Sequence, residues 1–399
     1  MKKKYRVNKK HRLAILTSHP IQYQVPLFRK LAEHPRIDLT IFFCSDYGVT
    51  EKMDPGFGVA FKWDVPLLGG YKYKFLRNFW PKPGLGRFWS LLNFGIVREL
   101  HKHKCDAIFL HSYSYATHLL AISAARLRGI PILVRSEPNL LVKISKLRGV
   151  LKESLLPLLL KSVDACMSIG KLNRQYYQHY DVPKEKIFHM PYAVDNEWFF
   201  EQRDLYLHRK REIKRGIGLD GKQKVILYLS KFLTRKRPMD LVQAFEGLDT
   251  SNTALVMVGD GEEKSRCEAY VEKRRMKDVY FLGFKNQTEV AKFYAIADVF
   301  VLPSENEPWG LVVNEAMCFG VPVIVTDEVG AGYDLIRNGE NGFSYQVGNI
   351  DRLRTGLQAV LNNEELQRQM GAMSIDIIQK WGIDEDLQAI LKALDENVR

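Results

Sequence analysis

The stretch from Asp298 to Val325 constrains the fold more than any other part of the chain, because it alternates apolar runs with a polar loop and a helical pattern. The runs 298–302 and 321–325 are short, mostly apolar and rich in valine, as buried strands are. Between them, residues 311–319 are apolar at helical spacing and stop before Gly320, which predicts a helix. The sequence therefore predicts one strand–helix–strand unit of a parallel sheet.

The loop of this unit, 303–310, is the part that can carry chemistry. In open sheets of this class, ligands bind at the carboxyl ends of the strands, and the start of the next helix offers free N–H groups to a phosphate. Glu307 lies in the loop and Glu315 lies roughly one turn into the helix, so their carboxylates can accept different hydroxyls of one ligand. The pattern predicts a sugar-nucleotide site, and the structural alternative is two surface acids at a helix start.

This segment resembles the signature of the retaining glycosyltransferases of family 4, which have the two-domain GT-B fold. The Glu-x7-Glu motif of that family corresponds to Glu307 and Glu315, and the flanking Glu-Pro-Trp-Gly and Gly-x-Pro-Val sequences also match. The resemblance implies that Glu307 contacts the donor sugar and that Glu315 binds the ribose. It also implies that the backbone of Gly310 and Leu311 meets the diphosphate.

A basic turn after the first strand of the C-terminal half carries a second part of the resemblance. The family grips the donor diphosphate with two basic residues five positions apart, and Lys231 and Lys236 match both. Ser230 departs from the pattern, because glycine is usual there. The structural alternative is a solvated basic turn, but its place at the end of a predicted strand favours phosphate binding. Segments that contain Gly259 and Phe284 match further family segments beside the nucleotide.

The N-terminal half departs from the family at two loops. After the first strand, where a glycine-rich loop is common, the chain has Ser-His-Pro-Ile-Gln-Tyr-Gln, with His19 and Gln22 as candidate cleft residues. After the fourth strand, Glu137 occupies the place of a histidine that lies near the reacting sugar in the family. Glu137 could bind a hydroxyl or orient the acceptor, or it could pair with Arg135 or a nearby lysine as structural support. His111, at a strand end, is a further candidate for the cleft wall.

Apolar runs of strand length alternate with helical patterns along both halves. In the first half the predicted strands are 13–16, 39–43, 107–110, 131–134, 165–168 and 187–190, and in the second they are 225–229, 255–258 and 279–282. Helices are predicted between several of them, at 25–32, 115–128 and 172–180. This alternation predicts doubly wound parallel sheets of the α/β class.

The resemblance extends this to a GT-B fold with two Rossmann-like domains that face each other across a cleft. The predicted domains are an acceptor-binding domain over 1–194, a donor-binding domain over 195–375 and a helical tail over 376–399 that packs back on the first domain. The boundary near 195 is placed before the polar stretch 202–223.

Charge is divided unevenly along the chain. Residues 1–200 hold 32 Lys and Arg against 15 Asp and Glu, or +17, whereas residues 201–399 carry −4, within a total of +13. Basic and aromatic residues interleave at 71–80 and 87–89. Such a surface suits anionic lipid, a diphosphate-lipid acceptor or nucleic acid, and the alternative is a solvated face over packed aromatic stems. With the donor motifs beside it, the expected partners are an anionic membrane surface and a lipid-linked acceptor, not nucleic acid.

Metal chemistry and membrane spans are not predicted. The ten histidines all lie at or before His208, and the only Asp-x-Asp, 384–386, starts the tail, where its acids are expected to cap a helix. Five scattered cysteines fit a reducing compartment. No apolar run reaches 18 residues, and the run 13–16 is too short for a signal peptide. The expectation is a cytoplasmic protein without metal or cofactor, peripheral on the inner face of the cell membrane.

The interpretation is a retaining, metal-independent glycosyltransferase of hexosyltransferase type. It would move a sugar from a UDP- or GDP-linked donor to a hydroxyl of a saccharide or lipid-linked acceptor, in cell-envelope polysaccharide or glycolipid biosynthesis. The family implies front-face displacement, in which the departing phosphate helps take the acceptor proton. Two alternatives stay open: a sugar-nucleotide epimerase of the same fold, and a catalytically inactive binding or scaffold protein. The intact acids and lysines of the motifs argue against the inactive protein.

Overall fold

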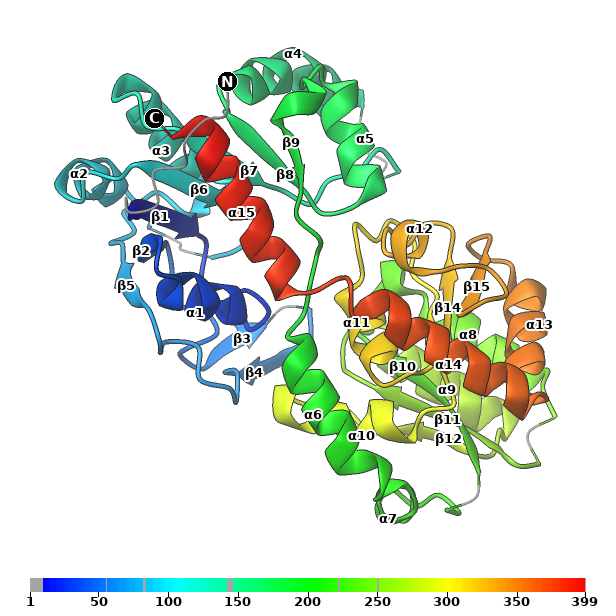
Figure 1. Cartoon of the computed structure of the whole chain (residues 1–399). Helices are drawn as coiled ribbons and strands as arrows, with labels where there is room; N and C mark the ends of the chain where they lie inside the picture. Colours follow the sequence, from blue (N-terminus) through cyan, green and yellow to red (C-terminus); the bar gives the residue numbers. More distant parts are fainter. Residues whose placement is uncertain are drawn as a thin grey trace, which may run out of the picture.

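The computed structural model describes residues 10–54, 56–81, 84–141, 146–221, 223–249 and 251–398, with the side chains of 146–151 excepted. It has two lobes, each built on a parallel sheet flanked by helices (Figure 1). The α/β class and the two doubly wound domains predicted from the sequence are confirmed.

The first sheet has seven parallel strands in the order β5-β2-β1-β6-β7-β8-β9. Its strands are β1 (His11–Thr17), β2 (Ile37–Phe43), β5 (Lys72–Phe75), β6 (Ala107–His111), β7 (Ile132–Arg135), β8 (Ala165–Ser168) and β9 (Ile187–His189). Leu13 of β1 pairs with Leu39 of β2 on one side and with Ala107 of β6 on the other. The short apolar run 13–16 is therefore the centre of a buried strand, which accounts for its hydrophobicity.

The second sheet has six parallel strands in the order β12-β11-β10-β13-β14-β15. They are β10 (Lys224–Leu229), β11 (Thr253–Val258), β12 (Val279–Phe281), β13 (Val299–Leu302), β14 (Val323–Thr326) and β15 (Gly342–Tyr345). The unit β13–α11–β14, with α11 at Leu311–Cys318, is the one predicted from the valine-rich runs.

Helices connect and cover the strands of both sheets. Their bounds are α1 (Val25–Glu33), α2 (Gly95–Lys102), α3 (Ala116–Leu127), α4 (Lys146–Lys161), α5 (Lys171–His179), α6 (Asn196–Leu207), α7 (Lys210–Gly216), α8 (Pro238–Glu246), α9 (Lys264–Arg274), α10 (Gln287–Ile296), α12 (Gly332–Leu335), α13 (Ile350–Leu361), α14 (Glu364–Ile378) and α15 (Ile383–Asn397). The polar stretch after 195 is helical, and Asp195 caps α6 by accepting a hydrogen bond from the N–H of Trp198 at 3.1 Å.

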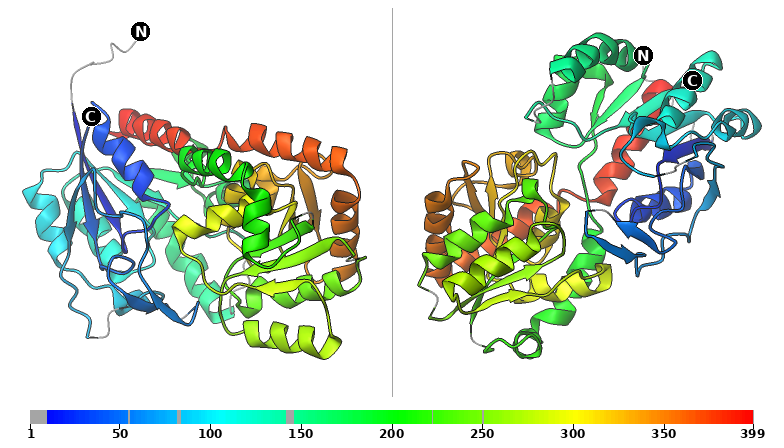
Figure 2. Two further views of the ribbon diagram at one scale, coloured as in Figure 1. Left: turned by 90° about the horizontal axis from the view of Figure 1, so that it is seen from below. Right: turned by 180° about the vertical axis from the view of Figure 1, so that it is seen from behind.

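The last helix, α15, returns from the C-terminal lobe and packs on the N-terminal lobe (Figures 1 and 2). Its buried residues Leu387, Ile390 and Leu394 share a core with Leu13 of β1 and Phe28 of α1. Burying a leucine or isoleucine side chain stabilises a fold by about 1.5–3 kcal/mol. The tail is therefore part of the N-terminal core, while the exact boundaries at 195 and 376 stay predictions.

A hairpin that the sequence did not predict lies between β2 and β5. Its strands β3 (Lys52–Asp54) and β4 (Val59–Phe61) are antiparallel, and the chain runs on to Asp64. We call the described residues of 52–64 the strap, because they reach the C-terminal lobe: Asn286 donates to the carbonyl of Lys62 at 2.8 Å, and the N–H of Thr288 donates to Asp64 at 3.2 Å.

The order of the strands predicts one crevice at the edge of each sheet. In the first sheet β1 lies between β2 and β6, and in the second β10 lies between β11 and β13. Connections leave in opposite directions at such points, so the loops that follow these strands diverge and leave a ligand site. The loops after β1 and β6, and those after β10 and β13, are thus where a cleft is expected.

Candidate active site

A pocket of about 460 Å³ opens beside the loops after β10 and β11, and residues from both lobes line it. We call it the interdomain pocket. It brings together most of the residues predicted for the donor or the cleft: His19, Gln22, Lys231, Lys236, Gly259, Phe284 and Glu315. They come from four separate loops and one helix, so the convergence is a property of the fold.

Glu307 lies behind the wall of this pocket. Its carboxylate, only 8% exposed, accepts hydrogen bonds from Lys236 and, at 2.9 Å, from Arg235, and both of these residues line the pocket. Burial alone would raise the pKa of Glu307, but the charges of Lys236 and Arg235 outweigh it and hold the pKa below its usual value. The carboxylate of Glu307 is turned toward these two cations, because a buried carboxylate needs countercharges.

Glu315 projects into the interdomain pocket from α11. Its carboxylate accepts a hydrogen bond from the Tyr294 hydroxyl at 2.6 Å. Burial raises the pKa of Glu315 to about 7, although the hydrogen bond from Tyr294 acts against this. A carboxyl that titrates near neutral pH is typical of ligand sites.

Lys231 is held by the strap. Its ammonium lies 2.8 and 3.0 Å from the two carboxylate oxygens of Asp54, and 4.3 Å from the centre of the Phe57 ring. The lysine predicted to bind phosphate therefore contacts an acid from the other lobe.

Two glycines allow these loops to approach one another. Gly259 has a φ of +133°, and a side chain there would place Cβ 2.0 Å from the carbonyl oxygen of Ser230. Gly310, just before Leu311 at the start of α11, has a φ of +97°, and its Cβ would lie 2.8 Å from Leu302. Only glycine fits either position. Ser230 meets Gly259 through its backbone, so a serine is accommodated where the family usually has glycine.

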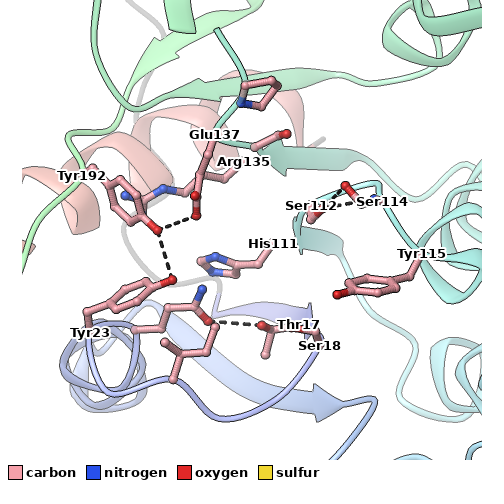
Figure 3. Close-up of a pocket in the computed structure, with 14 residues that line it drawn as sticks. Thr17, Ser18, Tyr23, His111, Ser112, Ser114, Tyr115, Arg135, Glu137 and Tyr192 are labelled. Carbon is pink, nitrogen blue, oxygen red and sulfur yellow. Dashed lines mark hydrogen bonds between the residues drawn. The ribbon is translucent and has the colours of Figure 1, made fainter. Parts of the chain in front are cut away.

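A second pocket, of about 290 Å³, lies within the N-terminal lobe, and we call it the N-terminal pocket (Figure 3). The loops after β1, β6 and β7 form it, and Glu137 and His111 line it. Hydroxyl groups dominate its wall, from Thr17, Ser18, Tyr23, Ser112, Ser114, Tyr115, Ser136 and Tyr192. Tyr23 also lines the interdomain pocket, so the two pockets adjoin.

Glu137 faces two tyrosines across this pocket (Figure 3). It accepts a hydrogen bond from the Tyr192 hydroxyl, which is 3.0 Å from the hydroxyl of Tyr23. Partial removal from water raises the pKa of Glu137, and the hydrogen bond from Tyr192 and the charge of Arg135 oppose this shift. Solvent still reaches the side chain through the pocket. The carboxylate is therefore placed to contact a ligand.

Arg135 does not form its ion pair with Glu137. Its guanidinium lies 3.2 Å from the carboxylate of Asp386 on α15, donates to the carbonyl of Pro191 at 3.0 Å, and covers the ring of Tyr192 at 4.8 Å. The direct pairing of Arg135 with Glu137 that the sequence left open is thus not observed. Because the tail supplies the countercharge, Glu137 remains available to a ligand.

The acids at the start of α15 also differ from the expectation that they cap the helix. Only Glu385 does so, by accepting the N–H of Gly382 at 2.9 Å. Asp384 pairs with Lys30 on the surface at 2.7 Å, and Asp386 is buried against Arg135. Long-range partners outcompete the local cap at these two positions.

The histidines in the two pockets are uncharged at neutral pH. Burial lowers the pKa of His19 to about 4, and its Nδ1 is 2.9 Å from the hydroxyl of Ser18. Burial also lowers the pKa of His111, whose Nε2 has no hydrogen-bond partner in the part of the chain that the structure describes. Figure 3 shows His111 directed into the N-terminal pocket. It can meet a ligand as a neutral ring.

Several residues of the site were not predicted. Arg235 stands between the two predicted lysines, and its place in the same basic turn was the available signal. No local sequence pattern indicates Tyr192 and Tyr294, because they contact Glu137 and Glu315 from distant segments of the chain. Asp54 reaches Lys231 across 177 positions, and no sequence pattern indicates this.

Neither a metal-binding cluster nor a membrane-spanning helix occurs among the described residues. No group of three or more His, Cys, Asp or Glu side chains among them could hold a metal ion. Within the same residues, no helix combines the length and hydrophobicity that crossing a membrane requires. The five cysteines are free and buried.

Part of the chain matches a known protein family. Residues 209–375, which include the interdomain lysines and both acids of the motif, match the family model described as "Glycosyl transferases group 1". Over these residues the chain is similar to the group 1 glycosyltransferases. The family resemblance predicted from the sequence is thus confirmed for this part of the chain, while the roles of Glu307 and Glu315 stay predictions.

Two curated proteins are similar to parts of this chain. An N-acetyl-alpha-D-glucosaminyl L-malate synthase from Bacillus anthracis is 35% identical over 175 residues, 43% of this chain and 45% of that protein. A UDP-Gal:alpha-D-GlcNAc-diphosphoundecaprenol alpha-1,3-galactosyltransferase from Escherichia coli is 26% identical over 281 residues, 68% of this chain and 70% of that protein. The chain spans about half the length of the first curated relatives it matches.

The fold also matches solved structures over nearly the whole chain. The crystal structure of Anabaena HepE in complex with UDP has a TM-score of 0.71 and 15% identity, and the match covers 97% of this chain and 100% of that one. At this identity the likeness shows the fold alone.

Proposed function

We propose that this protein is a retaining, metal-independent hexosyltransferase that moves a sugar from a nucleoside diphosphate donor to a hydroxyl of a saccharide or lipid-linked acceptor in cell-envelope polysaccharide or glycolipid biosynthesis. The observation that carries the proposal is the convergence of Lys231, Lys236, Arg235 and Glu315 on one pocket, with Glu307 beside it. The UDP-linked donor named for the Escherichia coli relative supports uracil as the base.

The donor would occupy the interdomain pocket. Lys231, Lys236 and Arg235 offer three positive charges to the diphosphate, which is the role that a metal ion plays in other transferases. Glu315 would accept the ribose hydroxyls, and Glu307 would contact the donor sugar while orienting two of the cations. Gly310 and Leu311 begin α11, whose positive end favours a phosphate. Activity is expected to survive a chelator.

The acceptor would enter the N-terminal pocket, where hydroxyl groups and Glu137 can bind a sugar ring. In a front-face displacement the bond between the anomeric carbon and the phosphate oxygen breaks, and the bond to the acceptor oxygen forms on the same face. The acceptor proton passes to the departing phosphate. Glu137, next to Tyr192 and Tyr23, would orient the acceptor hydroxyl.

A donor and acceptor panel tests this function. Binding of UDP, GDP and ADP by calorimetry identifies the base, and UDP-sugars are then incubated with and without simple glycosides. Nucleotide release that depends on the acceptor, with an α-linked product by NMR, is the expected result. Isomerised donor sugar without an acceptor would instead indicate an epimerase, and the absence of nucleotide binding and of turnover would indicate an inactive scaffold.

The titration of Glu315 predicts a pH dependence of nucleotide binding. Because burial raises its pKa to about 7, this carboxyl keeps its proton below neutral pH and is then a weaker acceptor for ribose hydroxyls. UDP affinity is expected to rise about fivefold between pH 6 and 8, since hydrogen bonds to an ionised group are stronger. The phosphate of UDP titrates equally in the Glu315→Gln variant, so only the difference between the two calorimetric profiles counts. Identical profiles would remove Glu315 from the ribose site.

We also propose that the enzyme is cytoplasmic and docks on an anionic membrane surface. Residues 77–94 present the exposed aromatic side chains that support this, namely Phe79, Trp80, Phe88, Trp89 and Phe94. Trp80 stacks on Trp89 at 6.3 Å, and Arg77 covers Phe79. The loop adjoins the N-terminal pocket, because the N–H of Gly86 donates to Tyr115 at 3.1 Å. Aromatic rings beside arginines suit the interface of an anionic bilayer.

The lysines of β5 contribute less than the sequence suggested, since Lys72 pairs with Asp38 and Lys74 with Glu99. We therefore expect the Trp80→Ala/Trp89→Ala variant to co-sediment at least fivefold less with anionic vesicles at low salt, by loss of interfacial aromatic area. A Trp63→Ala variant, changed outside this loop, is the control. Equal sedimentation of both variants would assign the loop to a soluble acceptor or to solvent.

A further inference from the structure

The strap forms the wall of the interdomain pocket that faces the donor lysines. Phe57 and Phe61 pack against Phe284 of the C-terminal lobe, with ring centres 4.7 and 5.1 Å apart. All three rings line the pocket, together with Asp54. A segment of the N-terminal lobe thus contributes directly to the pocket proposed for the donor.

Asp54 is fixed by its own lobe. Its carboxylate accepts hydrogen bonds from the N–H groups of Gly56 at 2.7 Å and Phe57 at 2.9 Å, and from the Tyr47 hydroxyl at 2.8 Å. It is 8% exposed. These three bonds come from residues within a few positions, so they hold the carboxylate in place whether or not Lys231 is present.

Lys231 is the more exposed partner of this ion pair. A lysine ammonium is a point charge on a flexible stem, and this one is 31% exposed as a side chain while it contacts both oxygens of Asp54 at 2.8 and 3.0 Å. A diphosphate that binds Lys231 would compete with Asp54 for the same ammonium.

We propose that Asp54 is a positioning residue of the donor site that holds Lys231 before the donor binds and is displaced from it by the donor diphosphate. This inference rests on the proposed function. The strap carboxylate stands in for a phosphate oxygen, so the ion pair between the lobes opens when the donor binds. Donor affinity is then set in part by a residue of the lobe proposed to bind the acceptor.

Calorimetric titration of the full chain with UDP and with inorganic pyrophosphate tests the inference. Asp54→Asn keeps an oxygen for the N–H groups of Gly56 and Phe57 but loses the charge, and it is expected to bind both probes about fivefold more tightly. In the Lys231→Ala background the same substitution should change neither affinity, because the competition is for Lys231.

Two matched variants separate this effect from others. Asp46→Asn removes one charge shortly before the strap, at a residue that pairs with Lys52, and it should leave both affinities within twofold. Asp64→Ala removes the strap contact to Thr288 without touching Lys231, and it should do the same. If either control tightens binding as much as Asp54→Asn, the cause is net charge or a looser strap and the inference fails.

The remaining outcomes are also decisive. If the unmodified chain binds UDP and Asp54→Asn binds it equally or more weakly, the inference is overturned while the proposed function stands. An effect of Asp54→Asn that persists without Lys231 overturns it as well. If no variant binds either probe, the proposed function fails and takes the inference with it.

Discussion

Replacing Glu307 with glutamine is expected to lower the turnover number by about a hundredfold or more, because groups that stabilise charge in the transition state commonly contribute that much. The carboxylate holds Lys236 and Arg235 at the pocket wall. Without its charge, these cations lose their orientation toward the leaving diphosphate, and the donor sugar loses its proposed contact. Steady-state rates with the donor identified by the panel measure the effect.

Glu305→Gln is the matched control for this variant. Glu305 lies two residues earlier in the same loop and pairs with Arg237 at 3.2 Å, so it should retain near-normal turnover. The melting temperature of both variants is measured as well, since Lys236 is buried and loses a countercharge when Glu307 is neutralised. A folded Glu307→Gln variant with normal turnover would contradict the assignment of this residue.

The local patterns in the sequence were sufficient for the central strands. Runs such as 321–325 are apolar on both faces, because strands in the middle of a parallel sheet are covered on both sides. The edge strand β5, at Lys72–Phe75, escaped prediction because lysines alternate with its aromatic residues, as suits an exposed edge. Its basic and aromatic pattern predicted an exposed surface. The segment is indeed largely exposed, but it also forms a strand.

The site could be predicted where the rule for carboxyl ends of strands applies. Lys231, Lys236 and Glu315 follow or flank neighbouring strands, so the fold itself brings them to one pocket. That rule says nothing of which acid neutralises which base. Glu307 accepts a hydrogen bond from Lys236, and Arg135 pairs with Asp386 and not with the nearby Glu137. Such choices depend on tertiary distances that no local spacing encodes.

Removing Asp386 is expected to give the largest loss of stability. The Asp386→Ala variant should lose about 3–5 kcal/mol, because it leaves the buried guanidinium of Arg135 without a countercharge. Both partners are less than a tenth exposed, and α15 contributes to the core of the N-terminal lobe. Urea denaturation followed by intrinsic fluorescence measures the change. Asp384→Ala, on the same helix, removes only an exposed pair with Lys30 and should cost at most about 1 kcal/mol.

A double variant shows what the buried pair is for. Replacing Arg135 with Met and Asp386 with Leu removes both charges, and stability is expected to return to near the original value, since apolar residues commonly substitute for a buried pair without loss. The turnover of this double variant should nevertheless be lower than that of the unmodified chain, because Arg135 no longer covers the Tyr192 ring that orients Glu137. Acceptor KM, measured against kcat, locates the defect. If the double variant regains both stability and turnover, the pair only fastens the tail, and Glu137 does not depend on it.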